Sequence, residues 1–242
     1  MQKTILITGG AGFIGSHLAD QYISKGAKVL AIDDFSTGSE ENIAHLKANK
    51  DFECVKDTIL NEQALEPLIK RADMVYHLAA AVGVYTIVEK PLQSLITNLQ
   101  GTEKVLALCN KYKKKVLIAS TSEVYGKSQK FPFKEDEDTV MGSTKISRWS
   151  YAYAKAIDEF LALAYYREHK LPLVVVRFFN TVGPRQTGRY GMVIPNFVRQ
   201  AMTGEDITIF GDGQQSRCFT YVNDVVNEIV KLMETPKAEG EV

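Results

Sequence analysis

Cysteine is scarce in this sequence, and the positions of its cysteines exclude two classes of protein. Cys54, Cys109 and Cys218 are odd in number and no two lie three residues apart, which excludes a simple disulfide framework and a CxxC metal or redox motif. The four histidines show no metal-ligand spacing, so we expect no metal site. No signal-peptide pattern follows the first residue, because Lys3 is charged and a strand pattern begins at once; this predicts a cytoplasmic protein.

Net charge and long apolar runs are also lacking. The 29 basic residues balance 29 acidic ones, which argues against nucleic-acid binding, since phosphate contacts need uncompensated positive charge. No apolar run approaches the roughly 18 residues that cross a bilayer, so we expect no membrane span. What remains is a chain of 242 residues, 45% of them hydrophobic, which is typical of a soluble globular protein with one or two domains.

Short apolar runs alternate with segments whose apolar residues are spaced three and four apart. The expected strands are residues 3–8, 28–32, 52–55, 74–77, 116–119 and 173–177. The expected helices between them are residues 12–24, 41–48, 62–69, 91–111 and 149–168. This alternation predicts an α/β fold, a Rossmann-type doubly wound parallel sheet with helices on both faces.

The alternation ends near residue 177, and the chain from residue 180 onward is richer in glycine, proline and arginine. This part has patterns for a helix at 192–202, a short strand at 207–210 and a helix at 223–233. We therefore predict a sheet domain at residues 1–179 and a smaller C-terminal lobe at residues 180–242, packed over the carboxyl edge of the sheet.

A glycine-rich segment, TGGAGFIG, follows the first expected strand and opens the first expected helix. Gly9, Gly12 and Gly15 let the backbone turn tightly and approach a pyrophosphate, whose charge meets free N–H groups at the helix start. Asp33 ends the second strand 18 residues beyond Gly15, close to where an acid meets the ribose hydroxyls. No arginine follows it in residues 34–37, which favours NAD over NADP. The alternative is a tight strand-to-helix turn and an ordinary turn aspartate.

Tyr151 and Lys155 lie four residues apart on an expected helix and so share one face. A phenol has a pKa near 10, and lowering it to about 7 requires roughly 4 kcal/mol of anion stabilisation. A neighbouring ammonium and the positive nicotinamide are expected to supply it. The hydroxyls of Ser120, Thr121 and Ser122 end the preceding strand, where they can hold the substrate oxygen. The alternatives are a chance helical spacing and a cap on the next turn.

These residues resemble a known family. The motifs that carry the resemblance are TGGAGFIG, DDFSTG (33–38), HLAA (77–80), STSEVYG (120–126), Tyr151-x-x-x-Lys155 and RFFNTVGPR (177–185). Together they are similar to the extended short-chain dehydrogenase/reductase family of NAD-dependent nucleotide-sugar epimerases, dehydratases and decarboxylases, over essentially the whole chain. The resemblance implies that residues 1–179 bind NAD and carry the catalytic residues, and that residues 180–242 bind a nucleotide sugar, UDP-linked.

The resemblance also implies roles for single residues. The NAD contacts would be Gly9, Gly12, Phe13, Ile14, Asp33, Asp34, Thr37, Gly38, Asp57, Leu78, Ala79, Ala80, Tyr151 and Lys155. The catalytic set would be Thr121, Tyr151 and Lys155, and the nucleotide diphosphate would lie against Asn180, Arg185 and Arg217. Tyr151 would take the proton of the sugar 4-hydroxyl while a hydride leaves C4 for NAD, which gives a 4-keto sugar.

The fate of the 4-keto sugar depends on neighbouring residues. Four features resemble the UDP-glucuronate decarboxylases: Ser122, Glu123, Arg148 and the run that begins at Arg217. The leading hypothesis is therefore decarboxylation, with Ser122, Glu123 and Arg217 serving the carboxylate step. The alternatives are a UDP-hexose or UDP-uronate 4-epimerase and then a nucleotide-sugar 4,6-dehydratase. A non-catalytic NAD-binding module is a hypothesis of a different class.

Two further expectations come from comparison with family members. Family members continue beyond the position that corresponds to Val242, into a last strand and more of the sugar-binding lobe. The substrate lobe is therefore expected to be incomplete here. The helices expected at 91–111 and 149–168 match the pair that forms the family's dimer interface, which predicts a homodimer. The apolar residues on these helices include Leu95, Leu99, Leu106, Phe160, Leu161 and Tyr165. Burial within one chain is the alternative explanation for them.

Overall fold

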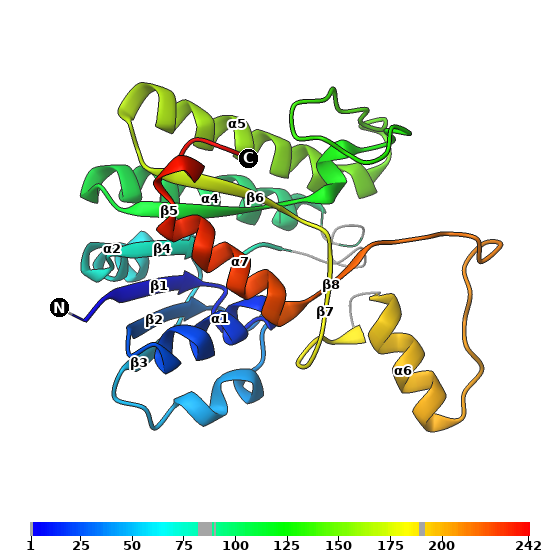
Figure 1. Cartoon of the computed structure of the whole chain (residues 1–242), viewed down its shortest axis with the longest axis horizontal. Coiled ribbons are helices and arrows are strands. Elements are labelled where there is room, and N and C mark those ends of the chain that lie inside the picture. The colour runs from blue at the N-terminus through cyan, green and yellow to red at the C-terminus, as the bar shows by residue number, and fades with distance from the viewer. Residues whose placement is uncertain (1, 82–88, 90, 189–191) are drawn as a thin grey trace.

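The structure, a computed structural model, describes residues 2–81, 89, 91–188 and 192–242. One parallel sheet is formed by β1 (Thr4–Thr8), β2 (Lys28–Asp33), β3 (Phe52–Lys56), β4 (Met74–His77), β5 (Lys115–Thr121) and β6 (Leu173–Phe178). Its strand order is β3-β2-β1-β4-β5-β6, so the order reverses between β1 and β4. The predicted doubly wound Rossmann-type sheet is confirmed (Figure 1).

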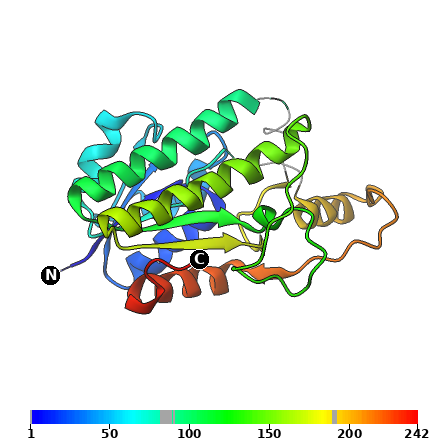
Figure 2. The same ribbon diagram turned by 90° about the horizontal axis from the view of Figure 1, so that it is seen from above.

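Helices cover both faces of the sheet (Figures 1 and 2). One face carries α1 (Phe13–Ser24), the 3₁₀ helix η1 (Glu40–Leu46) and α7 (Val222–Glu234); the other carries α2 (Glu62–Arg71), α4 (Pro91–Tyr112) and α5 (Ser150–His169). Alternate residues of β1 enter the two cores: Ile5 and Ile7 pack with Ile229 of α7, and Leu6 packs with Leu106 of α4. Because both faces are buried, the strands read as continuous apolar runs.

Smaller elements lie beside the carboxyl edge of the sheet. They are η2 (Ser122–Tyr125), η3 (Ser147–Trp149), β7 (Asn180–Val182), α6 (Val193–Thr203) and β8 (Phe219–Tyr221). The 3₁₀ helix η5 (Pro236–Ala238) follows α7 and lies at the amino end of β5 and β6. Strands β7 and β8 pair with each other in parallel, apart from the main sheet. The long segment between α6 and β8 extends away from the sheet (Figure 1).

Two sequence-based expectations about secondary structure are wrong. Residues 207–210 do not form a strand: Ile207, Ile209 and Phe210 are exposed, and no described strand pairs with them. The helix expected at 41–48 is the 3₁₀ helix η1, which begins after Ser39, whose hydroxyl accepts a hydrogen bond from Glu41 N at 3.2 Å. An apolar run becomes a strand only where a neighbouring strand can take up its backbone groups.

The last residues of the chain return to the sheet. Helix α7, which the prediction placed in the smaller lobe, packs on the sheet next to α1. Beyond it, Gly240 N donates to Leu173 O at 2.8 Å and Val175 N donates to Glu241 O at 3.1 Å, so these residues lie along the free edge of β6. Of the helices that the structure describes, none is long and apolar enough to cross a membrane.

Candidate active site

The site lies where neighbouring parallel strands end. The carboxyl ends of the parallel strands meet at one edge of the sheet. The predicted cofactor residues follow β1 to β4, and Thr121 to Glu123 follow β5. In a doubly wound sheet this edge, at the point where the strand order reverses, is where ligands bind.

The glycine turn holds the start of α1 against the end of β1. Gly9 has a φ of 73°, and a Cβ there would lie 2.9 Å from Ala79 N. A Cβ at Gly15 would overlap Gly9 O, so α1 could not start so close to the strand with any larger residue. Gly12 precedes the first helical residue and provides no side-chain cap. The first N–H groups of α1 are therefore open to an anion such as a pyrophosphate.

Asp33 joins the end of β2 to this turn. Its Oδ2 accepts Ala11 N at 2.9 Å and its Oδ1 accepts Phe35 N at 2.8 Å. Burial raises the pKa of Asp33, while the hydrogen bonds from Phe35 and Ala11 lower it. Gly38 packs so closely that a Cβ there would lie 2.9 Å from Asp33 Oδ1. The carboxylate is thus fixed at the sheet edge beside the turn, where the sequence predicts the ribose.

The remaining predicted cofactor residues surround the same edge. Asp57 N donates to Asp33 O at 3.2 Å, and Ala79 N donates to Thr8 Oγ1 at 3.1 Å. The half-buried ones are Phe13, Ile14, Thr37, Leu78, Ala79 and Ala80, and Asp34 is exposed.

Asn98 is a structural support of this edge that the sequence analysis missed. It is buried on α4, its Oδ1 accepts Ala81 N at 2.8 Å, and its Nδ2 donates to Ala81 O at 3.3 Å. Asn98 therefore fixes the chain just beyond the predicted NAD contacts at 78–80. The available signal was an asparagine on the apolar face of an expected helix.

Thr121 and Tyr151 lie on elements that meet at the end of β5. Thr121 caps η2, and its Oγ1 accepts Glu123 N at 3.2 Å. Tyr151 lies in the first turn of α5, and its pKa is raised by burial, by the charge of Glu123 and by that of Asp158. The charges of Glu123 and Asp158 therefore act directly on the predicted catalytic phenol.

Lys155 differs from its expected role as a simple source of positive charge. Its Nζ donates to Asp158 Oδ2 at 3.2 Å, and both side chains are almost fully buried. Because this ammonium is paired with a carboxylate, it does not offset the effects that raise the pKa of Tyr151. The expected lowering of that pKa by Lys155 and by the positive nicotinamide stays a prediction.

Glu123 and the hydroxyls around it divide into two groups. Burial raises the pKa of Glu123, and the charge of Arg148 lowers it. Ser122 is half-buried beside it. Ser120, which the sequence grouped with the substrate-facing hydroxyls, is instead buried and donates to Glu159 Oε1 of α5. The site therefore presents Thr121, Ser122 and Glu123, and Ser120 serves the packing of α5 against β5.

The three predicted diphosphate ligands do not form one cluster. Asn180 Nδ2 donates to Cys218 O at 3.1 Å, which places it beside the segment of the exposed Arg217. Arg185 instead forms an ion pair of 2.8 Å with Asp20 of α1. Within the described residues, no hydrogen bond or ion pair joins these three to Tyr151, so their substrate role stays a prediction.

The sequence matches the NAD dependent epimerase/dehydratase family over residues 5–242. A UDP-N-acetyl-alpha-D-glucosaminuronate decarboxylase of Bacillus cytotoxicus is 44% identical over 100% of this chain and 74% of its own length. UDP-glucuronic acid decarboxylase 1 of Xenopus tropicalis is 38% identical over 97% of this chain, which spans 54% of that protein.

A solved structure agrees with these sequence relatives. The UDP-glucuronic acid 4-epimerase of Bacillus cereus, in complex with UDP-glucuronic acid and NAD, superposes with a TM-score of 0.89 at 35% identity, covering 99% of this chain and 76% of that one. The glycine turn, the fixed Asp33 and the pair of Tyr151 and Lys155 thus occur on a fold whose relative is solved with NAD. The chain belongs to the NAD dependent epimerase/dehydratase family, a family of NAD-dependent enzymes.

Proposed function

We propose that this protein is an NAD-dependent decarboxylase of a UDP-linked hexuronate. The observation that carries the proposal is Glu123, a carboxyl group with a raised pKa whose charge acts on Tyr151, in a chain similar to two curated uronate decarboxylases. A carboxyl group buried beside the reacting sugar is suited to proton transfer, because a site that removes a carboxylate must also deliver a proton to the carbon that is left.

The residues of the sheet edge fit NAD. The uncapped start of α1 suits the pyrophosphate, and the carboxylate of Asp33 suits the two ribose hydroxyls while it repels a 2′-phosphate. The remaining contacts at Phe13, Ile14, Asp34, Thr37, Gly38, Asp57 and 78–80 are proposed on the same basis. When bound, NAD supplies hydride chemistry: it takes a hydride from C4 of the sugar and can return it.

Tyr151 handles the proton of the first step. Its phenolic oxygen accepts the proton of the sugar 4-hydroxyl as the C4–H bond breaks, which leaves a carbonyl group at C4. Thr121 Oγ1 already accepts a backbone N–H, so its own O–H is available to donate to the same sugar oxygen. The two groups come from α5 and the end of β5, which fixes their relative position.

The second step uses the carbonyl group at C4. The C5–C6 bond breaks, carbon dioxide leaves, and the electron pair moves through C5 to the C4 oxygen as an enolate. The protonated Tyr151 keeps its proton and donates a hydrogen bond to this enolate oxygen, and Glu123 supplies the proton that C5 needs. When C4 is reduced again, Tyr151 returns the first proton to the 4-hydroxyl. Ser122 and Arg217 are proposed to hold the substrate carboxylate, and Asn180 and Arg185 the diphosphate.

The two decarboxylase relatives differ in the group at C2 that their names imply, an acetamido or a hydroxyl group. Incubation with NAD and either UDP-N-acetylglucosaminuronate or UDP-glucuronate, followed by mass spectrometry, tests the proposal and identifies this group. We expect loss of carbon dioxide from one of the two, and no product with the Tyr151→Phe variant. If neither loses carbon dioxide under conditions in which NAD binds, the decarboxylase proposal is wrong.

A 4-epimerase is the second candidate, because the Bacillus cereus structure of that name covers almost the whole chain at 35% identity. A UDP-uronate product of unchanged mass and inverted C4 in the same experiment would favour it. In that case Glu123 serves only to hold the active-site loop.

We propose a homodimer formed through α4 and α5. Leu92, Ile96, Ile157 and Phe160 leave large apolar surfaces on these two helices, and Phe160 is 75% exposed. Leu106 of the expected set is instead buried in the core of the single chain. Sedimentation at micromolar concentration is expected to show a dimer that Phe160→Glu dissociates.

The division of the chain into two domains at residue 180 and the cytoplasmic location stay predictions.

A further inference from the structure

A line of buried polar side chains connects the end of β1 to the catalytic helix. Thr8 Oγ1 lies 2.8 Å from His77 Nδ1, and His77 Nε2 lies 3.1 Å from Thr102 Oγ1. Asp158 Oδ2 accepts hydrogen bonds from Thr102 Oγ1 at 3.0 Å and from Lys155 Nζ at 3.2 Å. None of the five residues is more than 1% exposed. They come from β1, β4, α4 and α5, so the line crosses the domain from the glycine turn to Lys155.

The chemistry of these groups fixes the direction of every hydrogen bond. The Asp158 carboxylate only accepts, so Thr102 donates to it and must accept from His77 Nε2–H. Burial and the charge of Lys155 lower the pKa of His77 to about 3, so the ring is neutral and its Nδ1 accepts the hydroxyl proton of Thr8. The carboxylate of Asp158 thus determines the tautomer of His77, which lies two hydrogen bonds away through Thr102.

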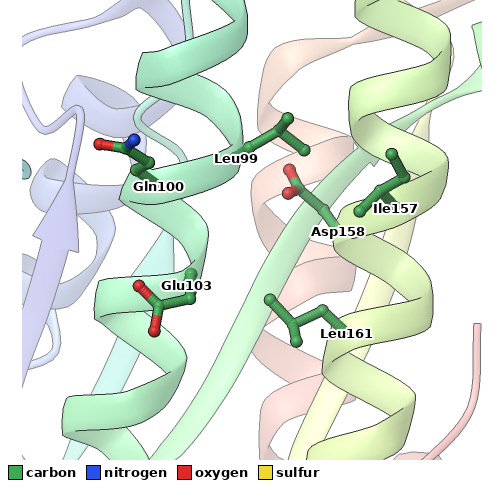
Figure 3. Close-up of a pocket in the computed structure, with 6 residues that line it drawn as sticks. All are labelled: Leu99, Gln100, Glu103, Ile157, Asp158 and Leu161. Atoms are coloured by element: carbon green, nitrogen blue, oxygen red, sulfur yellow. The ribbon is translucent and has the colours of Figure 1, made fainter.

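Asp158 has an oxygen that packing does not explain. Its Oδ1 is buried and has no hydrogen-bond partner among the described residues. The carboxylate lies between α4 and α5, where it lines a pocket of about 290 Å³ together with Leu99 and Leu161 (Figure 3). Burying a partly unsatisfied carboxylate is costly, and an apolar side chain would pack this space at lower cost. Its charge therefore has a use, and Lys155 is the cation that it contacts.

We propose that Asp158 is a positioning residue for the reaction at Tyr151: it holds the ammonium of Lys155 and orients the hydrogen-bond chain through Thr102 and His77. The link to the reaction rests on the proposed function, because that function gives Tyr151 its role. The hydrogen-bond chain itself does not depend on the proposed function. Asp158 thus acts through Lys155 and makes no contact with substrate.

The charges that surround Asp158 are few. Lys155 and Glu159 of α5 act on it, and His77 of β4 is neutral behind Thr102. Glu103 of α4 lines the same pocket but is exposed. Glu103→Gln is therefore a matched control for Asp158→Asn, since both replace one carboxylate of the same pocket with an amide.

The first experiment measures the tautomer of His77 in the full chain, by proton–nitrogen spectra of isotope-labelled histidine. Single glutamine variants at His17, His45 and His169 assign the other rings. We expect a proton on Nε2 and no titration of His77 between about pH 5 and about pH 8. Thr102→Ser keeps the hydroxyl and is expected to keep this tautomer, whereas Thr102→Val removes it and shifts the proton to Nδ1. If His77 of the parent protein carries its proton on Nδ1, the proposed direction of the hydrogen-bond chain is wrong.

The second experiment measures the hydride-transfer step at saturating NAD while the concentration of the nucleotide sugar is varied. For Asp158→Asn we expect kcat to fall about tenfold or more with KM for the sugar unchanged, because Lys155 loses its anchor. The rising limb of the pH profile should also move to lower pH, since a negative charge that acts on Tyr151 is removed. Glu103→Gln should change neither quantity.

The two experiments separate the possible failures. An Asp158→Asn variant with the parent kcat and pH profile overturns the positioning role. A variant that loses activity only in proportion to lost folded protein, with an unmoved pH limb, also overturns it. The tautomer is measured without substrate, so the hydrogen-bond chain can be confirmed or rejected even if the decarboxylase proposal fails.

Discussion

Glu159 of α5 and Arg177 of β6 form a partly buried ion pair. Arg177 Nη2 lies 2.8 Å from Glu159 Oε2, and Arg177 Nε lies 3.0 Å from Glu159 Oε1, so the guanidinium engages both oxygens. Ser120 of β5 donates to the same carboxylate, and Arg177 also stacks over the ring of Tyr125 at 4.8 Å. The helix that carries Tyr151 and Lys155 is thereby attached to the two strands beneath it.

Glu159→Gln should therefore destabilise the fold. Removing one partner leaves the charge of the partly buried Arg177 uncompensated, and we expect the free energy of unfolding to fall by about 2 kcal/mol in urea titrations. The control is Glu53→Gln, which breaks a pair with Arg71 that is about 40% exposed and screened by solvent. There we expect a loss below about 1 kcal/mol. Equal losses in the two variants would show that Glu159 contributes no more than a surface pair.

Gly15→Ala should prevent the start of α1 from closing on the glycine turn. The added Cβ overlaps Gly9 O, a backbone atom that cannot move without opening the turn. We expect NAD binding, measured by calorimetry, to be lost. Gly26→Ala is the control, because Gly26 also has a positive φ but nothing lies within 4 Å of the added Cβ. It should cost about 1 kcal/mol of stability and leave NAD affinity unchanged. Normal NAD binding by Gly15→Ala would contradict the assignment of the turn.

Asp33→Ser should change the choice between NAD and NADP. The carboxylate is the group expected to bind the ribose hydroxyls and to repel a 2′-phosphate. Because it also accepts Ala11 N and Phe35 N, its loss can loosen the turn and weaken both dinucleotides. The ratio of the two affinities is therefore the diagnostic quantity, and we expect it to fall about tenfold. An unchanged ratio would mean that Asp33 only supports the turn.

Glu123→Gln should alter the pH dependence of NADH formation. Tyr151 must lose its proton to act as a base, so the rate rises as the pH passes through its pKa. Glu123 raises that pKa, and removing its charge should move the rising limb to lower pH by about half a unit to one unit. Glu228→Gln, on the exposed side of α7, is the control and should not move it. An unmoved limb would place Glu123 outside the electrostatic reach of Tyr151.

Most of the main sheet could be predicted from sequence, because its strands are buried on both faces. All six expected strands exist within two residues of their predicted ends, and the alternation of strands and helices predicted their parallel pairing. Strands β7 and β8 were missed because three residues are too few to show a period. The expected strand at 207–210 failed because apolar composition alone does not provide a pairing partner.

The candidate site was less accessible to sequence reasoning. Local motifs identified the glycine turn, Asp33 and the pair of Tyr151 and Lys155, since each is a short spacing on one element. The hydrogen-bond chain from Thr8 through His77 and Thr102 to Asp158 joins four elements, so no sequence spacing predicts it. The pairing of Lys155 with Asp158 could not be predicted either, because the effect of a charge on Tyr151 depends on neighbours that come from the folded structure.

The most direct test of the account uses a UDP-linked uronate that carries a carbon isotope in the carboxylate and deuterium at C4. If Tyr151 and NAD oxidise C4 before the C5–C6 bond breaks, labelled carbon dioxide must be released, and the sugar product must keep its deuterium at C4 because the same hydride returns. We predict both results in a single incubation of the full chain. Recovery of the uronate with its carboxylate intact and C4 inverted would contradict decarboxylation and make this chain an epimerase.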